Sequence, residues 1–105
     1  MSVSNITDQD FSATISGKDK AIVKYFADWC GSCKLIAPKF RRLSDDERFE
    51  GVDFLEVNAE INEAARKAAN VDNLPFFAVF KNGEMVEGSA TSKIENVEQL
   101  LNKLN

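Results

Sequence analysis

Residues 21–34, AIVKYFADWCGSCK, contain the part of the sequence that decides the fold. Residues 21–27 are rich in β-branched and aromatic side chains, which predicts a buried strand. The spacing of apolar residues after Cys30 predicts a helix to about Asp45, and Pro38 inside it should kink that helix. Cys30 and Cys33 are therefore expected where a buried strand gives way to a helix.

The rest of the chain alternates between strand-like and helix-like patterns, without a repeat or a linker. This order predicts one α/β domain over residues 1–105. The expected elements are a helix from Thr7 to Gly17, a strand over 52–57, a helix over 61–69, a strand over 74–81, a return strand from Met85 and an amphipathic helix from Ser92 onward.

Three local signals sharpen these boundaries. Pro75 is tolerated at the entrance of a strand, so it should open the strand that follows it. Asn82-Gly83 is typical of a type I′ hairpin turn, so the strand before it and the strand after it should be antiparallel. Ser92 and Glu95 have the spacing of a capping box before the last helix.

Composition excludes several classes of protein. The chain has 105 residues, 44% of them hydrophobic, which fits one globular domain. With 13 Lys+Arg, 17 Asp+Glu and a net charge of −4, it lacks the basic surplus that nucleic acids and anionic membranes attract. Neither a membrane span nor the pattern of a signal peptide is present in the printed sequence. We expect a cytoplasmic monomer.

Cys30 and Cys33 are the only cysteines, and the chain has no histidine. A structural zinc ion takes four ligands, so a zinc site could form only between chains. A disulfide across so short a loop removes little entropy from the unfolded chain and is a weak structural staple. Two buried, inert cysteines would not need this spacing. Reactivity is the preferred interpretation.

A helix that begins near Cys30 would present unpaired N–H groups and its positive dipole end to that sulfur, and both favour a thiolate. Cys33 lies three residues further on, on the same helical face, where it can attack a mixed disulfide formed at Cys30. The pair can therefore exchange two electrons with a partner.

The neighbouring residues suit this chemistry. Gly31 leaves the approach to Cys30 open, Ser32 adds a hydroxyl group, and Lys34 adds positive charge. Trp29 is either a packing aromatic or a contact surface beside the sulfurs, and its position slightly favours the second.

Several motifs together resemble the thioredoxin family, in order and spacing over nearly the whole chain. They are WCGSCK at 29–34, Ala37-Pro38, FLEVN at 54–58, Leu74-Pro75 and FKNGE at 80–84. The resemblance implies an α/β thioredoxin fold, with a central mixed sheet of four to five strands flanked by four helices and a parallel opening strand at one edge. It also implies a cis Pro75 facing the disulfide, where the Leu74 backbone would pair with a bound segment.

The resemblance further implies a thiol–disulfide oxidoreductase that reduces protein disulfides, with Cys30 attacking and Cys33 resolving. Such a domain binds no cofactor. Its electrons come from NADPH through a flavoprotein thioredoxin reductase, and its partners are that reductase and disulfide-containing target proteins.

The sequence departs from the family at the centre of the site. Ser32 replaces the usual proline, which can shift the reduction potential. Lys24 stands where the family has a buried Asp, and a lone ammonium there needs a partner. Glu56 occupies the matching position on the next strand, so we expect a charge-swapped Lys24–Glu56 pair. Glu56, or Lys24 in its neutral form, could carry protons for Cys33; alternatively, Lys24 reaches solvent and does no chemistry.

A second departure concerns substrate contacts. Phe76 follows Pro75 where relatives commonly have Thr, and Ala90 or Thr91 replaces an expected glycine. Trp29, Leu74 and Phe76 could form an apolar rim that favours hydrophobic targets, unless Phe76 packs in the core.

Two other functions remain open at this point. One is a disulfide isomerase or thiol oxidase, which needs a more oxidising pair and usually an extracytoplasmic location. The other is a non-enzymatic binding module of the same fold, for which neither thiol would be required.

Overall fold

The computed structural model describes residues 3–105. In chain order its elements are β1 Val3–Asn5, α1 Asp8–Ser16, β2 Lys20–Phe26, α2 Gly31–Ser44, the short 3₁₀ helix η1 Glu47–Phe49, β3 Asp53–Asn58, α3 Glu63–Ala68, β4 Phe76–Lys81, β5 Glu84–Ala90 and α4 Ile94–Asn102. Within this range no helix has the length and apolar character needed to cross a membrane.

The five strands form one mixed sheet in the order β1-β3-β2-β4-β5. β3 runs parallel to both β1 and β2, whereas β4 is antiparallel to β2 and to β5. The expected mixed sheet with a parallel opening strand at one edge is thus confirmed.

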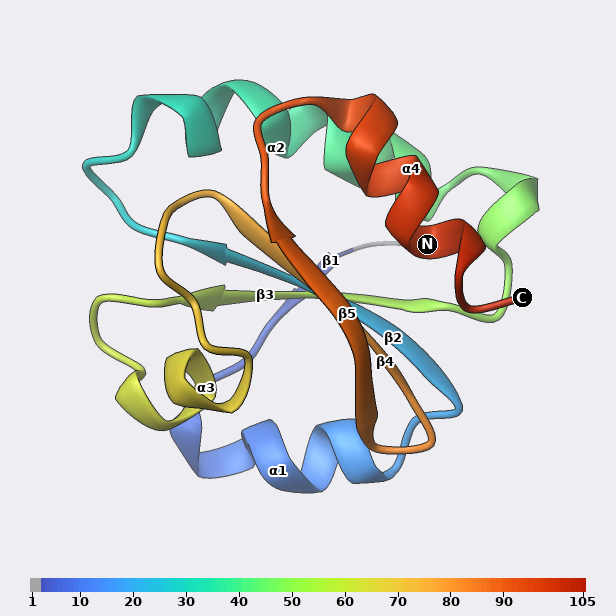
Figure 1. The fold of residues 1–105 in the computed structure, drawn as a ribbon, viewed down its shortest axis with the longest axis horizontal. Helices are drawn as coiled ribbons and strands as arrows, with labels where there is room; N and C mark the ends of the chain where they lie inside the picture. The colour runs from blue at the N-terminus through green and yellow to red at the C-terminus, as the bar shows by residue number, and fades with distance from the viewer. Residues whose placement is uncertain (1–2) are drawn as a thin grey trace.

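Helices cover both faces of the sheet, α1 and α3 on one side and α2 and α4 on the other (Figure 1). The central strands are therefore buried on both faces, as the continuous apolar runs of β2 and β4 require. Tyr25 and Leu55 belong to the core beneath α1 and α3, while Ile22 and Phe77 belong to the core beneath α2 and α4.

The turn and the first cap agree with the sequence. Asn82 and Gly83 have φ angles of 53° and 85°, as a type I′ turn needs. Thr7 precedes the first residue of α1, and its backbone N–H donates to Asp10 Oδ1 at 2.8 Å.

Two predicted helix starts were wrong. α3 begins at Glu63 rather than at residue 61, because the Asp8 carboxylate of α1 accepts hydrogen bonds from the N–H groups of Ala64 and Ala65 and so fixes the first turn. Ile61 lies outside the helix and is 73% exposed.

The predicted capping box at α4 does not form. Lys93, not Ser92, precedes the helix, and no side chain of the capping residue bonds to the first turn. Thr91 bonds to the start of the helix instead: its Oγ1 accepts hydrogen bonds from the Lys93 N–H at 3.1 Å and from Asn96 Nδ2 at 2.9 Å.

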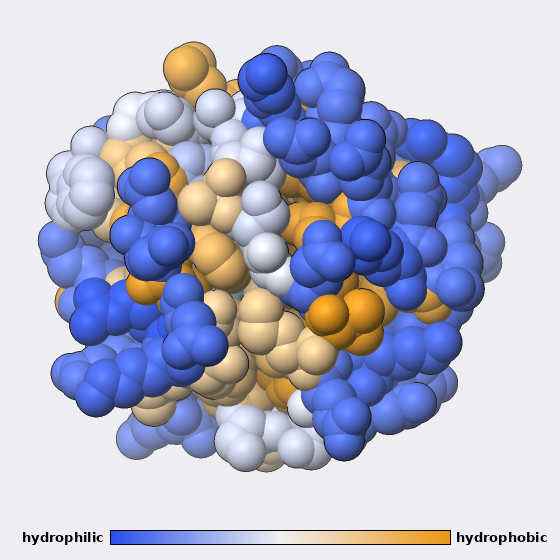
Figure 2. Space-filling model, viewed as in Figure 1, coloured by the Kyte–Doolittle hydropathy of each residue, from blue (hydrophilic) through white to orange (hydrophobic). Residues whose placement is uncertain are grey.

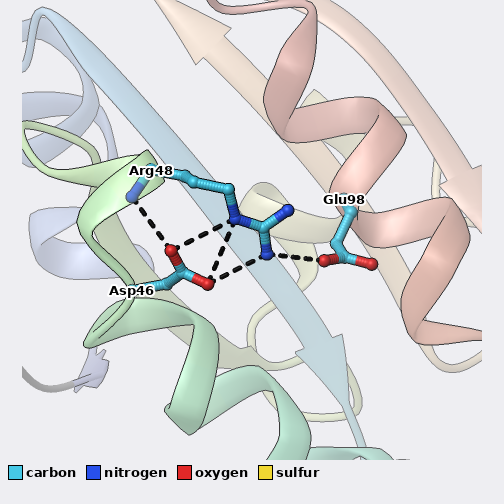
Figure 3. A network of polar contacts seen from close by, with 3 residues as sticks. All are labelled: Asp46, Arg48 and Glu98. Carbon is cyan, nitrogen blue, oxygen red and sulfur yellow. Dashed lines mark hydrogen bonds and ion pairs between the residues drawn. The ribbon is translucent and has the colours of Figure 1, made fainter.

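A charged cluster at the surface links η1 to α4 (Figure 3). Arg48 donates to Asp46 Oδ2 at 2.9 Å and to Glu98 Oε2 at 2.7 Å through the same Nη2 atom. Segments 50 residues apart in the sequence are joined here.

The face toward the viewer in Figure 2 carries a band of neutral and hydrophobic surface between hydrophilic areas. β5 crosses this face at the edge of the sheet (Figure 1), and its exposed large apolar side chains are Met85 and Val86. Charged residues on an open edge strand oppose pairing with a strand of another chain, and on β5 these are Glu84 and Glu87.

Candidate functional site

The disulfide lies where β2 gives way to α2. Cys30 precedes the first residue of α2, and its Sγ accepts the Cys33 N–H at 3.1 Å. The two cysteines are joined, with their Cα atoms 5.3 Å apart, and they are only 5% and 3% exposed. The predicted position of Cys30 at a helix N-terminus is confirmed, and the backbone donor there suits a sulfur that bears negative charge.

The loop before β4 forms one wall of the site. The Leu74–Pro75 peptide bond is cis, as the resemblance implied. Leu74 packs, together with Phe26, against the small cluster of Ala27, Cys30 and Cys33. Leu74, the residue before Pro75, thus lies against the disulfide.

A polar pocket of about 220 Å³ adjoins this wall. Its lining includes Ser32, Asn73, Ala90 and Thr91 together with the Leu74–Pro75 loop. Thr91 donates its backbone N–H to the Pro75 carbonyl at 3.1 Å. The replacements at Ser32 and Thr91 that the sequence pointed out therefore face the same space.

Trp29 lines a second pocket together with Leu74 and is a surface residue, not a packing aromatic. It is 68% exposed, and its indole Nε1 donates to Glu60 Oε2 at 2.6 Å. Nothing in the sequence pointed to Glu60, because 31 residues separate it from Trp29. Beside Trp29, a Cβ atom added at Gly31 would meet no atom within 4 Å, so the approach is open there.

Phe76 does not belong to the rim. It is 6% exposed and lies edge-on to Tyr25, with 6.1 Å between ring centroids. Strand alternation turns its ring toward the core beneath α1 and α3, where a Cβ atom at Gly88 would approach the ring within 2.8 Å. The prediction of an apolar rim is wrong for Phe76. Of the three predicted rim residues, only Trp29 and Leu74 remain.

Lys24 and Glu56 are paired, as expected. They are register partners on β2 and β3, and Lys24 Nζ lies 3.4 Å from Glu56 Oε1. The Lys24 side chain is only 6% exposed, so the alternative in which it reaches solvent is wrong. Its ammonium lies 5.6 Å and 5.5 Å from the ring centroids of Phe26 and Phe40, positions that favour a cation.

This pair adjoins the disulfide through a cavity of about 220 Å³ that Lys24, Glu56 and Cys33 all line. Glu56 is 28% exposed, and its Oε2 accepts a long hydrogen bond of 3.4 Å from Asn5 Nδ2. The contribution of Asn5 was missed, since only the parallel pairing of β1 with β3 brings it there. The carboxylate therefore connects a buried ammonium with solvent.

Metal ligands do not cluster in the structure. Over residues 3–105, no group of three or more His, Cys, Asp or Glu side chains could hold a metal ion.

Two cysteines that close into a disulfide and open again transfer two electrons, which is the chemistry of the thiol–disulfide oxidoreductases. The family model for thioredoxin matches residues 2–105. The chain belongs to the thioredoxin family, and its activity is that of a protein-disulfide reductase.

Several thioredoxins match this chain along almost their whole length. The chain is 34% identical to the thioredoxin of Bacillus subtilis over 104 residues, which covers 98% of each chain. It is 30% identical to the thioredoxin of Gallus gallus over 103 residues, covering 98% of this chain and 96% of the relative. Among solved structures, Plasmodium falciparum thioredoxin superposes with a TM-score of 0.87 at 30% identity, covering 95% of this chain and 97% of that one.

Proposed function

We propose that Cys30 is the attacking sulfur and Cys33 the resolving sulfur of this reductase. The observation that carries the assignment is the position of Cys30 before the first turn of α2, where its sulfur accepts the Cys33 N–H. A thiolate at Cys30 is stabilised there by the helix dipole and by this donor.

The reaction balances in two steps. The Cys30 thiolate attacks one sulfur of a target disulfide, the target S–S bond breaks, and the second target sulfur leaves as a thiolate that takes up a proton. Cys33 then loses its proton and attacks Cys30 Sγ, which breaks the mixed disulfide and releases the other target thiol. The target gains two electrons, and the Cys30–Cys33 pair loses two.

The Cys33 proton needs an acceptor, and we assign that role to the Glu56 carboxylate. Glu56 and Cys33 line the same cavity, and the partial exposure of Glu56 allows the proton to pass on to solvent. Lys24 acts through Glu56, because its ammonium lies 3.4 Å from Oε1 and holds the carboxylate in place.

The pH dependence of single-turnover disulfide reduction tests this role. We expect Glu56→Gln to slow the resolving step and to shift its pH profile, and Lys24→Met to shift the profile as well. Unchanged profiles for both variants would overturn the assignment to Glu56 while leaving the cysteine roles intact.

We further propose that the electrons come from NADPH through a flavoprotein thioredoxin reductase, and that disulfide-containing proteins receive them. Two solved structures of similar fold support this proposal. One is thioredoxin f2 in complex with a ferredoxin:thioredoxin reductase, and the other concerns the thiol resolving mechanism of a yeast mitochondrial 1-Cys peroxiredoxin through the glutathione and thioredoxin systems. With two cysteines in all, the chain has none left for a structural disulfide, which suits a monomer in a reducing compartment such as the cytoplasm.

Two measurements test the proposal as a whole. Cys33→Ser should trap a mixed disulfide with a target protein, whereas Cys30→Ser should trap none. The reduction potential of the Cys30–Cys33 disulfide, measured against glutathione buffers, should be about −270 mV. A value of about −180 mV would favour an isomerase or oxidase instead. Cellular function that survives loss of both thiols would favour a binding module.

A further inference from the structure

The outward side of α2 carries two adjacent rows of exposed residues. On a helix, residues at i, i+4 and i+7 lie on one line along the surface. The two rows are Lys34, Pro38 and Arg41, and Leu35, Lys39 and Arg42. All six are exposed, and together they are called the α2 ridge below.

The ridge concentrates positive charge in an acidic protein. Four of the 13 basic residues of the chain lie within α2, and none of its 17 acidic residues does. The net charge of −4 is therefore unevenly distributed: α2 is cationic, and the rest of the chain is acidic. α2 begins at the disulfide, so this cationic helix starts beside the reacting sulfurs.

These cations are available to a partner. None of the four forms an ion pair with any residue of the described range 3–105, whereas Lys18, Lys24, Arg48, Lys67 and Lys103 all do. Leu35 lies among them and is 77% exposed, the most exposed of the large hydrophobic residues. A surface that couples unpaired cations with one exposed apolar side chain is suited to a protein contact.

The ridge is also within reach of a segment bound at the disulfide. Lys34 directly follows Cys33 and lines the cavity behind it together with Arg41. Lys39 and Arg42 lie about 9 Å and 14 Å from Cys33 along the helix axis, at 1.5 Å per residue. A partner whose cysteine meets Cys30 would cover this distance with a few residues.

We infer that the α2 ridge docks redox partners that carry acidic side chains beside their reactive cysteines. This inference rests on the proposed function and specifies its partner class. Nucleic acid and anionic membranes fit less well, since four cations are few and the acidic remainder of the surface repels a polyanion. An acidic patch of limited size meets only the ridge and escapes that repulsion.

Competition between two peptide substrates tests the inference. Both contain the same disulfide-closed loop followed by six Gly/Ser residues, and they end in four Glu or four Lys. The ratio of their kcat/KM values on one enzyme cancels any change in the chemistry of the cysteines. At 20 mM salt we expect the unsubstituted chain to favour the acidic peptide about tenfold, and Lys39→Glu with Arg42→Glu to remove most of this preference.

The matched control changes the same charge elsewhere. Lys20 and Lys81 are register partners at the end of the sheet remote from the disulfide, so Lys20→Glu with Lys81→Glu alters net charge equally without touching the ridge. The control should keep the preference. Lys39→Gln with Arg42→Gln should give an intermediate ratio and guards against misfolding of the doubly acidic variant.

Three outcomes would overturn the inference. They are equal kcat/KM values for the two peptides on the unsubstituted chain, an equal loss of preference in the control, and tighter binding of a DNA oligomer or an anionic vesicle than of the acidic peptide. If neither peptide is reduced at all, the proposed function itself fails, which separates the two hypotheses.

Discussion

Two charged clusters in this chain each join one cationic side chain to carboxylates, but one cation is buried and the other is exposed. Lys24 and Glu56 pair at 3.4 Å, with side chains 6% and 28% exposed. Arg48 meets Asp46 and Glu98 at 2.9 Å and 2.7 Å, but its side chain is 57% exposed. The shorter contacts, those of Arg48, lie where solvent screens them. The longer contact, between Lys24 and Glu56, holds a cation that solvent hardly reaches.

The difference shows that burial, more than distance, decides what such contacts do. An exposed ion pair exchanges one well-solvated state for another and contributes little to stability. A buried ammonium has lost its water, so its carboxylate becomes indispensable, and its field acts on the neighbouring sulfur through a poorly screened medium. The buried pair should influence both folding and chemistry, whereas the exposed cluster should have a small effect on folding and none on the chemistry.

The largest expected effect is on stability when Glu56 is changed. Glu56→Gln leaves the Lys24 ammonium without its counter-charge and should lower the free energy of unfolding by about 2 kcal/mol, below the usual loss for a broken buried pair because Glu56 is partly exposed. Lys24→Met removes the buried charge itself and should cost less than about 1 kcal/mol. Urea denaturation of the oxidised proteins measures both, and equal losses would contradict this asymmetry.

The next effect is on the reduction potential. Lys24 and Cys33 line one cavity, so the ammonium favours negative charge on the sulfurs of the reduced pair and with it the reduced form. Lys24→Met should lower the equilibrium constant for reduction by glutathione about tenfold, which corresponds to ~30 mV. Glu56→Gln should raise that constant, and Arg48→Ala should leave it unchanged. The same direction of change for Lys24→Met and Glu56→Gln would refute this electrostatic account.

The buried pair was predictable from the sequence, and the exposed cluster was not. A lysine inside an apolar strand signals a missing partner, and the family order of strands places Glu56 beside it. The type I′ turn and the helix start at Cys30 followed from local patterns, whereas the mixed sheet was implied by the resemblance to the thioredoxin family. Arg48 lies in a short 3₁₀ helix that Asp46 caps, an element too short to show apolar periodicity in the sequence. Its second partner, Glu98, lies 50 residues away.

The errors in the site have more than one origin. The sequence leaves Phe76 open between rim and core, because alternation along β4 does not show which face is which when both faces are buried. The start of α3 depends on Asp8, a contact that arises only after the chain folds, and Glu60, which holds Trp29, was missed for the same reason. The cap of α4 is local, since Thr91 lies two residues before Lys93, but the Ser92–Glu95 spacing does not indicate it.

A smaller effect is expected when the exposed cluster is removed. Arg48→Ala breaks the contacts with both Asp46 and Glu98, but all three groups regain water. We expect Tm at pH 7 and low salt to fall by no more than about 2 °C. Thermal unfolding followed by circular dichroism measures this. A fall as large as that of Glu56→Gln would mean that burial does not separate the two clusters.

The smallest effect concerns how that difference depends on pH. Hydrogen bonds from Arg48, its side chain first and its backbone second, hold the pKa of Asp46 below its ordinary value of 3.8. A carboxyl with a lowered pKa in the folded state stabilises the fold above its ordinary pKa, and this contribution disappears as the pH falls through the lowered value. The Tm difference between the unsubstituted chain and Arg48→Ala should therefore be constant from pH 7 to about 4 and shrink below it. It should shrink at pH 7 in 0.5 M salt as well, because the cluster lies in solvent. A difference that persists at pH 2 would show that Arg48 acts through packing on Phe49, over whose ring its guanidinium lies at 4.8 Å, and not through charge.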